Sequence, residues 1–227
     1  MFYLLLLALV CVIGITTILI SRATDKRATD SVFIIVGFVL LALSLVAQLA
    51  LGFALDELFA KLFYWARIST ALAWLGLGVL FLVKPRMQSM RWLVIGIPVA
   101  TIFMLALVGL TQVTDAQDWY SSAQPIYAQI NDLLATNRPT RWGSLALNIF
   151  GAGALLYSAF LILTGFRKLL VSGLLALAAI GFLLPIFLPL QTANTLFFMI
   201  ELLPPLLLFA GLELLRVVAA APRRKSR

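Results

Sequence analysis

The chain of 227 residues is 63% hydrophobic and only 11% charged, and its mean hydropathy is +1.08. A soluble domain of this length cannot bury so much apolar surface, so the composition excludes a water-soluble fold and predicts an integral membrane protein. The formal net charge is +8. Because no soluble basic face is expected, this charge does not indicate a nucleic-acid partner, and membrane lipids are the expected surroundings.

A hydrocarbon core about 30 Å thick requires roughly 20 apolar residues in each helix that crosses it. Seven segments of the chain meet this requirement, which predicts an all-α fold: one domain, residues 1–227, built as a polytopic bundle of seven transmembrane helices. The first segment has no basic stretch before it and no small-residue cleavage site after it, so we expect a retained helix and not a signal peptide. The expected helices cover about residues 2–20, 32–55, 60–83, 92–113, 142–165, 168–190 and 193–217.

Lysine and arginine residues gather in alternate loops, and this pattern predicts the orientation of the bundle. Basic residues favour the cytoplasmic side of a membrane, so the N-terminus is expected outside and the C-terminus inside, in a bacterial cytoplasmic membrane. The basic tail, residues 218–227, is expected to anchor this orientation and could also contact anionic lipid or a cytoplasmic partner. The basic residues expected inside are Arg22, Lys26, Arg27, Lys84, Arg86, Arg91, Arg167, Lys168, Arg216, Arg223, Arg224, Lys225 and Arg227.

The longest connection, residues 114–141, is expected outside and is polar at both ends. Within it Pro125 stands where a helix could begin. Apolar residues then recur at helical spacing: Ile126, Ile130, Leu133 and Leu134. We therefore expect a short amphipathic helix that lies on the outer membrane surface. Such a helix could cover a pocket or dock a partner, although resting in the interface is the simpler role.

The stretch KLFYWARIST, residues 61–70, places the charged Arg67 inside an apolar helix. At a rise of about 1.5 Å per residue, Arg67 lies about 10 Å below the outer end of its helix, and Glu201 lies about 12 Å deep in the last helix. A charge at such depth is costly unless it faces the bundle interior and finds a partner. The sequence thus predicts an ion pair between Arg67 and Glu201, or a polar ligand that the two share.

Two further polar side chains are expected at the same level of the bundle. Gln48 belongs to the second expected helix and Asn148 to the fifth. The alternative to a ligand site is structural, with hydrogen bonds and one ion pair that join the helices. The binding interpretation is a pocket open to the outside and lined by Gln48, Arg67, Asn148 and Glu201.

The residue types that are missing restrict the chemistry. The sequence contains no histidine and a single cysteine, Cys11. No His-ligated haem, His-ligated chlorophyll or Cys/His metal site is therefore expected, and the last expected helix has no lysine for a retinal Schiff base. Nor does the sequence show a nucleophile with its base, a catalytic carboxylate pair or a phosphate-binding glycine loop, so no enzyme is expected. An apolar ligand such as a lipid, quinone or carotenoid needs no such motif and stays open.

Two runs of the chain carry a family resemblance. AKLFYWARISTALAWLGLGVLFLVKP, residues 60–85, and RWGSLALNIFGAGALLY, residues 141–157, resemble the seven-helix N-terminal sensor region of bacterial histidine kinases. The resemblance implies seven helices that have the N-terminus outside and feed signalling modules inside. After Arg216 this chain continues only as VVAAAPRRKSR, so a stand-alone form is implied, which acts through a partner protein or serves as a structural subunit. The residues that carry the resemblance are Lys61, Phe63, Trp65 and Ala66.

Three functions from different classes are compatible with these features. The first is a membrane sensor-like or ligand-binding module, in which a ligand rearranges the bundle and a partner protein reads the change. The second, nearly equal to it, is a non-catalytic accessory or structural subunit of a larger membrane complex, for example a photosynthetic or respiratory one. The third is a small transporter, indicated only by prolines that are expected to kink or open the last two helices: Pro185, Pro189, Pro204 and Pro205.

Overall fold

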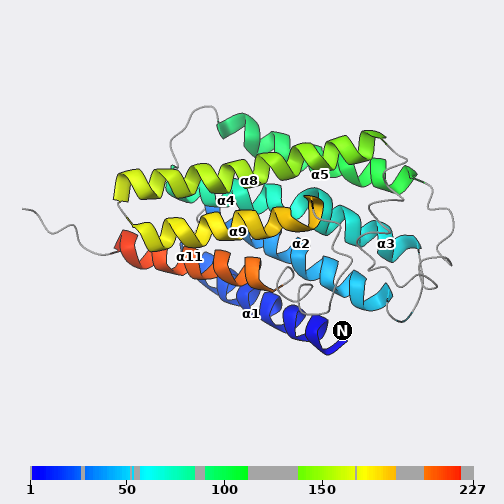
Figure 1. Ribbon diagram of the computed structural model, residues 1–227, viewed down its shortest axis with the longest axis horizontal. Helices are drawn as coiled ribbons and strands as arrows, with labels where there is room; N and C mark the ends of the chain where they lie inside the picture. The colour runs from blue at the N-terminus through cyan, green and yellow to red at the C-terminus, as the bar shows by residue number, and fades with distance from the viewer. Residues whose placement is uncertain are drawn as a thin grey trace, which may run out of the picture.

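The computed structural model describes residues 2–26, 29–51, 53, 57–84, 90–111, 138–166, 168–187 and 202–220. Over these residues the chain is all-α and forms seven helical rods that run along roughly the same direction (Figure 1). The predicted all-α, seven-helix fold is confirmed at this level. The helix expected near residues 125–134, the tail beyond Ala220 and the segment that contains Glu201 lie outside the described residues.

One of the seven rods is composite, because a π-helical segment interrupts it. Its three parts are α3 (Glu57–Phe63), η1 (Tyr64–Thr70) and α4 (Ala71–Val83). The other six rods are α1 (Phe2–Lys26), α2 (Thr29–Leu51), α5 (Met90–Leu110), α8 (Arg138–Phe166), α9 (Leu169–Phe187) and α11 (Leu203–Ala220).

Five of the helices are long and apolar enough to cross a membrane, which is the property of an integral membrane protein. Leu169–Leu184 forms a shorter apolar helix. The last two predicted spans, about 168–190 and 193–217, fall partly outside the described residues. The five candidate spans are Leu5–Ala23, Ser31–Leu51, Glu57–Val83, Trp92–Leu110 and Pro139–Gly165.

Several helix ends differ from the predicted ones because hydropathy marks only the part of a helix that suits hydrocarbon. α1 continues to Lys26, well past its apolar run, and α8 begins at Arg138 instead of residue 142. The expected kink or opening at Pro204 and Pro205 stays a prediction, because residues 188–201 just before them lie outside the described residues. Both prolines stand in the first turn of α11, where a missing backbone N–H disrupts no helical hydrogen bond.

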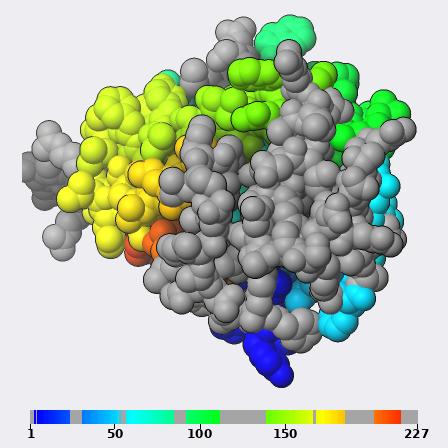
Figure 2. All heavy atoms as spheres, turned by 45° about the vertical axis from the view of Figure 1, so that its right-hand side comes forward, coloured from blue at the N-terminus to red at the C-terminus, as the bar shows by residue number. Residues whose placement is uncertain are grey.

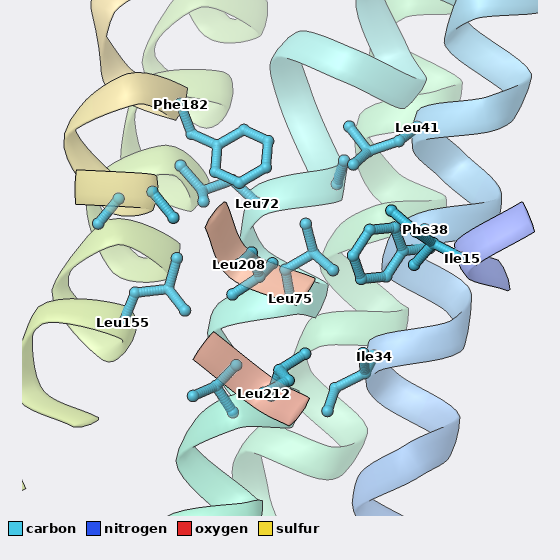
Figure 3. Packing of buried hydrophobic residues seen from close by; sticks show 14 of the residues in the cluster. Ile15, Ile34, Phe38, Leu41, Leu72, Leu75, Leu155, Phe182, Leu208 and Leu212 are labelled. Carbon is cyan, nitrogen blue, oxygen red and sulfur yellow. The ribbon is translucent and has the colours of Figure 1, made fainter. Parts of the chain in front are cut away.

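The composite rod lies at the centre of the bundle. Of its span, 78% is buried inside the protein, against 33% for the span in α1 and 22% for the span in α5. In Figure 3, Leu72 and Leu75 of α4 lie between side chains of α2 on one side and side chains of α8, α9 and α11 on the other. The flanking side chains include Ile34, Phe38 and Leu41 of α2, Leu155 of α8, Phe182 of α9, and Leu208 and Leu212 of α11.

The more peripheral helices present apolar side chains outward, as lipid-facing helices do. Figure 2 shows α8 (yellow-green) on the surface of the molecule and α1 (blue) at its opposite edge. Large side chains such as Val10 in α1, Ile102 in α5 and Phe160 in α8 are more than half exposed. A bilayer would cover these faces without any change in the bundle.

Glycines allow α4 to touch its two main neighbours closely. A Cβ atom at Gly76 would clash with the Gly151 carbonyl oxygen of α8, and one at Gly151 would clash with the Leu72 carbonyl oxygen of α4. On the α2 side, a Cβ atom at Gly37 would lie 2.6 Å from Leu75 Cδ2, and one at Gly78 would lie 2.5 Å from Ile34 Cγ1. Small residues permit such backbone contact, which is a principal source of association between helices in lipid.

Replacing Gly151 by alanine should therefore be far more harmful than the same change two residues later. Gly151→Ala drives a methyl group into the α4 backbone, and we expect a loss of about 1–3 kcal/mol in the free energy of unfolding. Gly153 is the matched control, because a Cβ atom built there has no heavy atom of a neighbouring helix within 4 Å among the described residues. Gly153→Ala should leave stability unchanged or raise it by up to about 1 kcal/mol. Unfolding in mixed micelles, followed by circular dichroism, measures both; equal losses would contradict the close α4–α8 contact.

Candidate functional site

The stretch YWARIST does not form an ordinary α-helix. Residues Tyr64–Thr70 adopt the wider π form, and the N–H of Ala71 bonds to the carbonyl of Ala66, five residues back. The Thr70 hydroxyl donates to the Trp65 carbonyl oxygen at 2.9 Å. A π turn is in effect one extra residue in an α-helix, and such turns are frequent at functional sites. The part of the bundle level with η1 is called the η1 half below.

α8 supplies polar partners to this turn. The Asn148 amide nitrogen donates to the Ile68 carbonyl oxygen of η1 and, at 2.8 Å, to the Ser144 carbonyl oxygen of its own helix. The hydroxyl groups of Ser69 and Ser144 lie 2.8 Å apart and share a hydrogen bond. Asn148 is only 3% exposed, so no water competes for these bonds. The Asn148 side chain therefore stabilises the π form of the central rod.

Arg67 points from η1 toward α9. Its side chain is buried, and the guanidinium carbon lies 5.2 Å from the centre of the Phe182 ring. An arginine over an aromatic face gains electrostatic attraction, which grows when water is absent. The predicted partner Glu201 lies outside the described residues, so the Arg67–Glu201 ion pair stays a prediction.

Gln48 of α2 lies level with η1. Ile34 and Gly37 meet Gly78 and Leu75 respectively, so α2 and α4 run antiparallel, and this register carries Gln48 to the level of Tyr64. The Gln48 side chain is 2% exposed, and among the described residues neither its amide oxygen nor its amide nitrogen finds a hydrogen-bond partner. A buried amide of this kind normally has at least one partner.

Three of the four residues predicted from the sequence thus lie buried on elements that meet at the π turn. Gln48 belongs to α2, Arg67 to η1 and Asn148 to α8. Their roles differ: Asn148 is bonded to backbone, Arg67 lies on an aromatic ring, and Gln48 has no hydrogen-bond partner within the described part of the chain. Within the described residues, no group of three or more His, Cys, Asp or Glu side chains could hold a metal ion.

Long polar side chains of the composite rod attach α5, a role that the sequence did not reveal. The Lys61 ammonium group donates to the Gly109 carbonyl oxygen at 3.0 Å, and the Trp65 indole N–H donates to the Thr101 carbonyl oxygen at 3.0 Å. The Trp74 indole N–H donates to the Thr101 hydroxyl at 2.9 Å. A buried indole N–H needs a hydrogen-bond acceptor. The two tryptophans were therefore the signal in the sequence that could have indicated this attachment of α5.

A second missed contact joins the first and last helices. Glu213 of α11 forms ion pairs with Arg22 of α1 and, at 3.1 Å, with Arg216 of its own helix. From the sequence, both arginines are expected to set the orientation alone. Since α1 and α11 run in the same direction (Figure 1), the Arg22–Glu213 pair joins the C-terminal ends of the two helices.

Comparisons of the chain with protein-family models, with curated proteins and with solved structures found no match. The resemblance to histidine-kinase sensor regions therefore stays an expectation. Packing also accounts for the residues that carry it. Phe63 and Ala66 are fully buried, and Lys61 and Trp65 hold α5.

Asn148→Leu should destabilise the protein because it removes the buried hydrogen bond that the Asn148 amide donates to the Ile68 carbonyl of the π turn. We expect a loss of about 1–3 kcal/mol in the free energy of unfolding. Ser158→Ala is the matched control on the same helix, because the buried Ser158 hydroxyl donates to the Ala154 carbonyl one turn earlier in its own helix. Its loss should change stability by less than about 0.5 kcal/mol. Equal effects of the two substitutions in micelle unfolding would rule out a special role for Asn148.

Proposed function

We propose that this chain is an integral membrane, non-enzymatic sensor-like module that binds a small ligand in the η1 half and acts through a partner protein. The observation that carries the proposal is the Gln48 side chain, which is buried level with a π turn and has no hydrogen-bond partner among the described residues. A buried amide without partners costs about 1–3 kcal/mol. A bound molecule that satisfies it would recover that free energy.

The chemistry of the site suggests the class of ligand. The Gln48 amide offers one acceptor atom and one donor group, so a matching ligand presents both a donor and an acceptor, as a hydroxyl, amide or protonated carboxyl group does. Arg67 adds positive charge on the neighbouring rod. The surrounding side chains are apolar, which suits an amphipathic molecule with a small polar head, such as a lipid or a quinone.

The proposed partner would read the bundle from the cytoplasmic side. The alternate loops with excess lysine and arginine support an orientation with the N-terminus outside and the C-terminus inside a bacterial cytoplasmic membrane. The inner loops and the basic tail would then face the partner. The likeness of residues 60–85 to histidine-kinase sensor regions supports the same direction of signalling.

The test is native mass spectrometry of the full chain, extracted from its own membrane in a mild detergent. Wild type, Gln48→Met and Ser44→Ala are compared; Ser44 is buried one turn away, and its hydroxyl bonds to the Leu41 carbonyl of its own helix. We expect a small molecule on wild type and on Ser44→Ala, and its loss from Gln48→Met. Wild type without any bound molecule would overturn the proposal. Stoichiometric recovery with subunits of a larger complex, unaffected by Gln48→Met, would identify an accessory subunit instead.

Gln48→Met also has an expected effect on stability. Methionine has nearly the shape of glutamine and no polar amide, so in protein stripped of bound molecules the substitution removes an unsatisfied buried group. We expect the free energy of unfolding to rise by about 1–3 kcal/mol. Chemical unfolding of delipidated protein in micelles measures this. A fall in stability would mean that the Gln48 amide has a protein partner after all.

A further inference from the structure

The composite rod is attached differently on the two sides of its π turn. After the turn, α4 is in backbone contact with α8 at Gly76 and Gly151, and it packs on α2 at Gly78. Before the turn, α3 spans only Glu57–Phe63. From α3, Lys61 donates to the Gly109 carbonyl of α5, and Phe63 lies in one buried cluster with Ala47 of α2 and with Met104 and Val108 of α5. The segment before the turn is therefore held by side chains, whereas the segment after it is held by backbone contact.

A π turn can return to α geometry, because it differs from an α-helix by one residue. In an α-helix each residue turns the chain by about 100° and advances it by about 1.5 Å. A change of the turn from π to α geometry would rotate the rod on one side of the turn by about 100° relative to the other side. It would also shift that side by about 1.5 Å along the helix axis. Since the glycine contacts fix α4, the motion would fall on α3.

The attachments of α5 lie on both sides of the turn. Lys61 precedes the turn and Trp65 lies within it, whereas Trp74 follows it and holds the Thr101 hydroxyl. Rotation of α3 would carry Lys61 and Trp65 away from their acceptors and leave Trp74 bonded to Thr101. The part of α5 from Thr101 to Leu110 would then lose its hydrogen bonds to α3 and η1 and could shift about Thr101. Its contacts with α8, at Met104 beside Gly143 and between the Thr111 and Thr140 hydroxyls, would remain.

We propose that η1 is a two-state element, whose change from π to α geometry releases the Thr101–Leu110 half of α5 from α3 while Trp74 keeps its hold on Thr101. The bonds from Asn148 to the Ile68 carbonyl and between the Ser69 and Ser144 hydroxyls stabilise the π state. Regulation of this change by a molecule at Gln48 rests on the proposed function; the two-state behaviour does not.

The experiment measures distances between spin labels by pulsed electron resonance on the full chain in lipid nanodiscs, with Cys11→Ser as background. Labels at Val46 of α2 and Leu105 of α5 report the swing of α5. Labels at Val46 and Ile149 of α8 report a distance that the proposal leaves unchanged. All three positions are exposed, at 46%, 46% and 56% respectively, so the labels disturb no packing.

Two variants shift the equilibrium. Deletion of Ala66 removes the extra residue and should move the Val46–Leu105 distance entirely to a second value, with the Val46–Ile149 distance unchanged. Asn148→Leu keeps the chain length and should raise the population of that second distance about tenfold, the effect of losing one buried hydrogen bond. Ser158→Ala should leave both distances as in wild type.

A Val46–Leu105 distribution that is the same in wild type and in Asn148→Leu would overturn the proposal, and this variant decides the matter if the deletion does not fold. No ligand is needed, so the result is separate from that of the binding experiment. Two distances without any bound molecule would support the switch and refute the proposed ligand. A bound molecule with one fixed distance would support the ligand and refute the switch.

Discussion

The structure depends on one constraint, which is the burial of the central rod: 78% of its span lies inside the protein. Every buried polar group of the rod must therefore be satisfied within the protein, by the rod itself or by neighbouring helices. The α4 segment meets this requirement by itself, because its backbone N–H and C=O groups bond within the helix and its side chains are apolar. Over η1 the wider turn disturbs the regular ladder, and Asn148 of α8 donates to the Ile68 carbonyl there. The polar residues of the bundle are concentrated where the regular helix is interrupted.

The two halves of the rod consequently differ in how they are held. α4 is fixed by direct backbone contact at glycines, an interaction with steep repulsion and little tolerance for displacement. η1 is held by hydrogen bonds from side chains such as Asn148, which have several rotamers and can be exchanged for other partners. A rigid segment in series with an adaptable one is the arrangement from which two-state elements are built.

Much of the fold could be predicted from the sequence because the bilayer allows few solutions. Apolar runs of sufficient length must be helices, and they located all seven rods. The level of Gln48, Arg67 and Asn148 followed from helix length and direction alone. The π turn could not be predicted, since an extra residue leaves no mark in a helix that is apolar on nearly every side. The attachment of α5 could not be predicted either, because Trp65 and Trp74 are suited both to the lipid headgroup region and to a hydrogen bond with a protein acceptor.

Depth also explains why the sequence predicts an ion pair for Arg67 and gives no sign of the pair between Arg22 and Glu213. A charge in the middle of an apolar run, such as Arg67, calls for a partner. Arg22 stands at the end of its apolar run, where positive charge has a sufficient reason in membrane orientation. Arg22 pairs with Glu213 because α1 and α11 are neighbours in the bundle. The order of the helices along the chain does not show which helices are neighbours.

The Arg22–Glu213 pair has a consequence for biosynthesis. Glu213 follows Arg22 by 191 residues, so the ribosome completes α1 well before it makes α11. Throughout that interval Arg22 lacks its carboxylate partner, and the contact between α1 and α11 can close only after the helices between them have been made. A nascent chain that lacks α11 therefore differs from the assembled bundle by an ion pair that it cannot form.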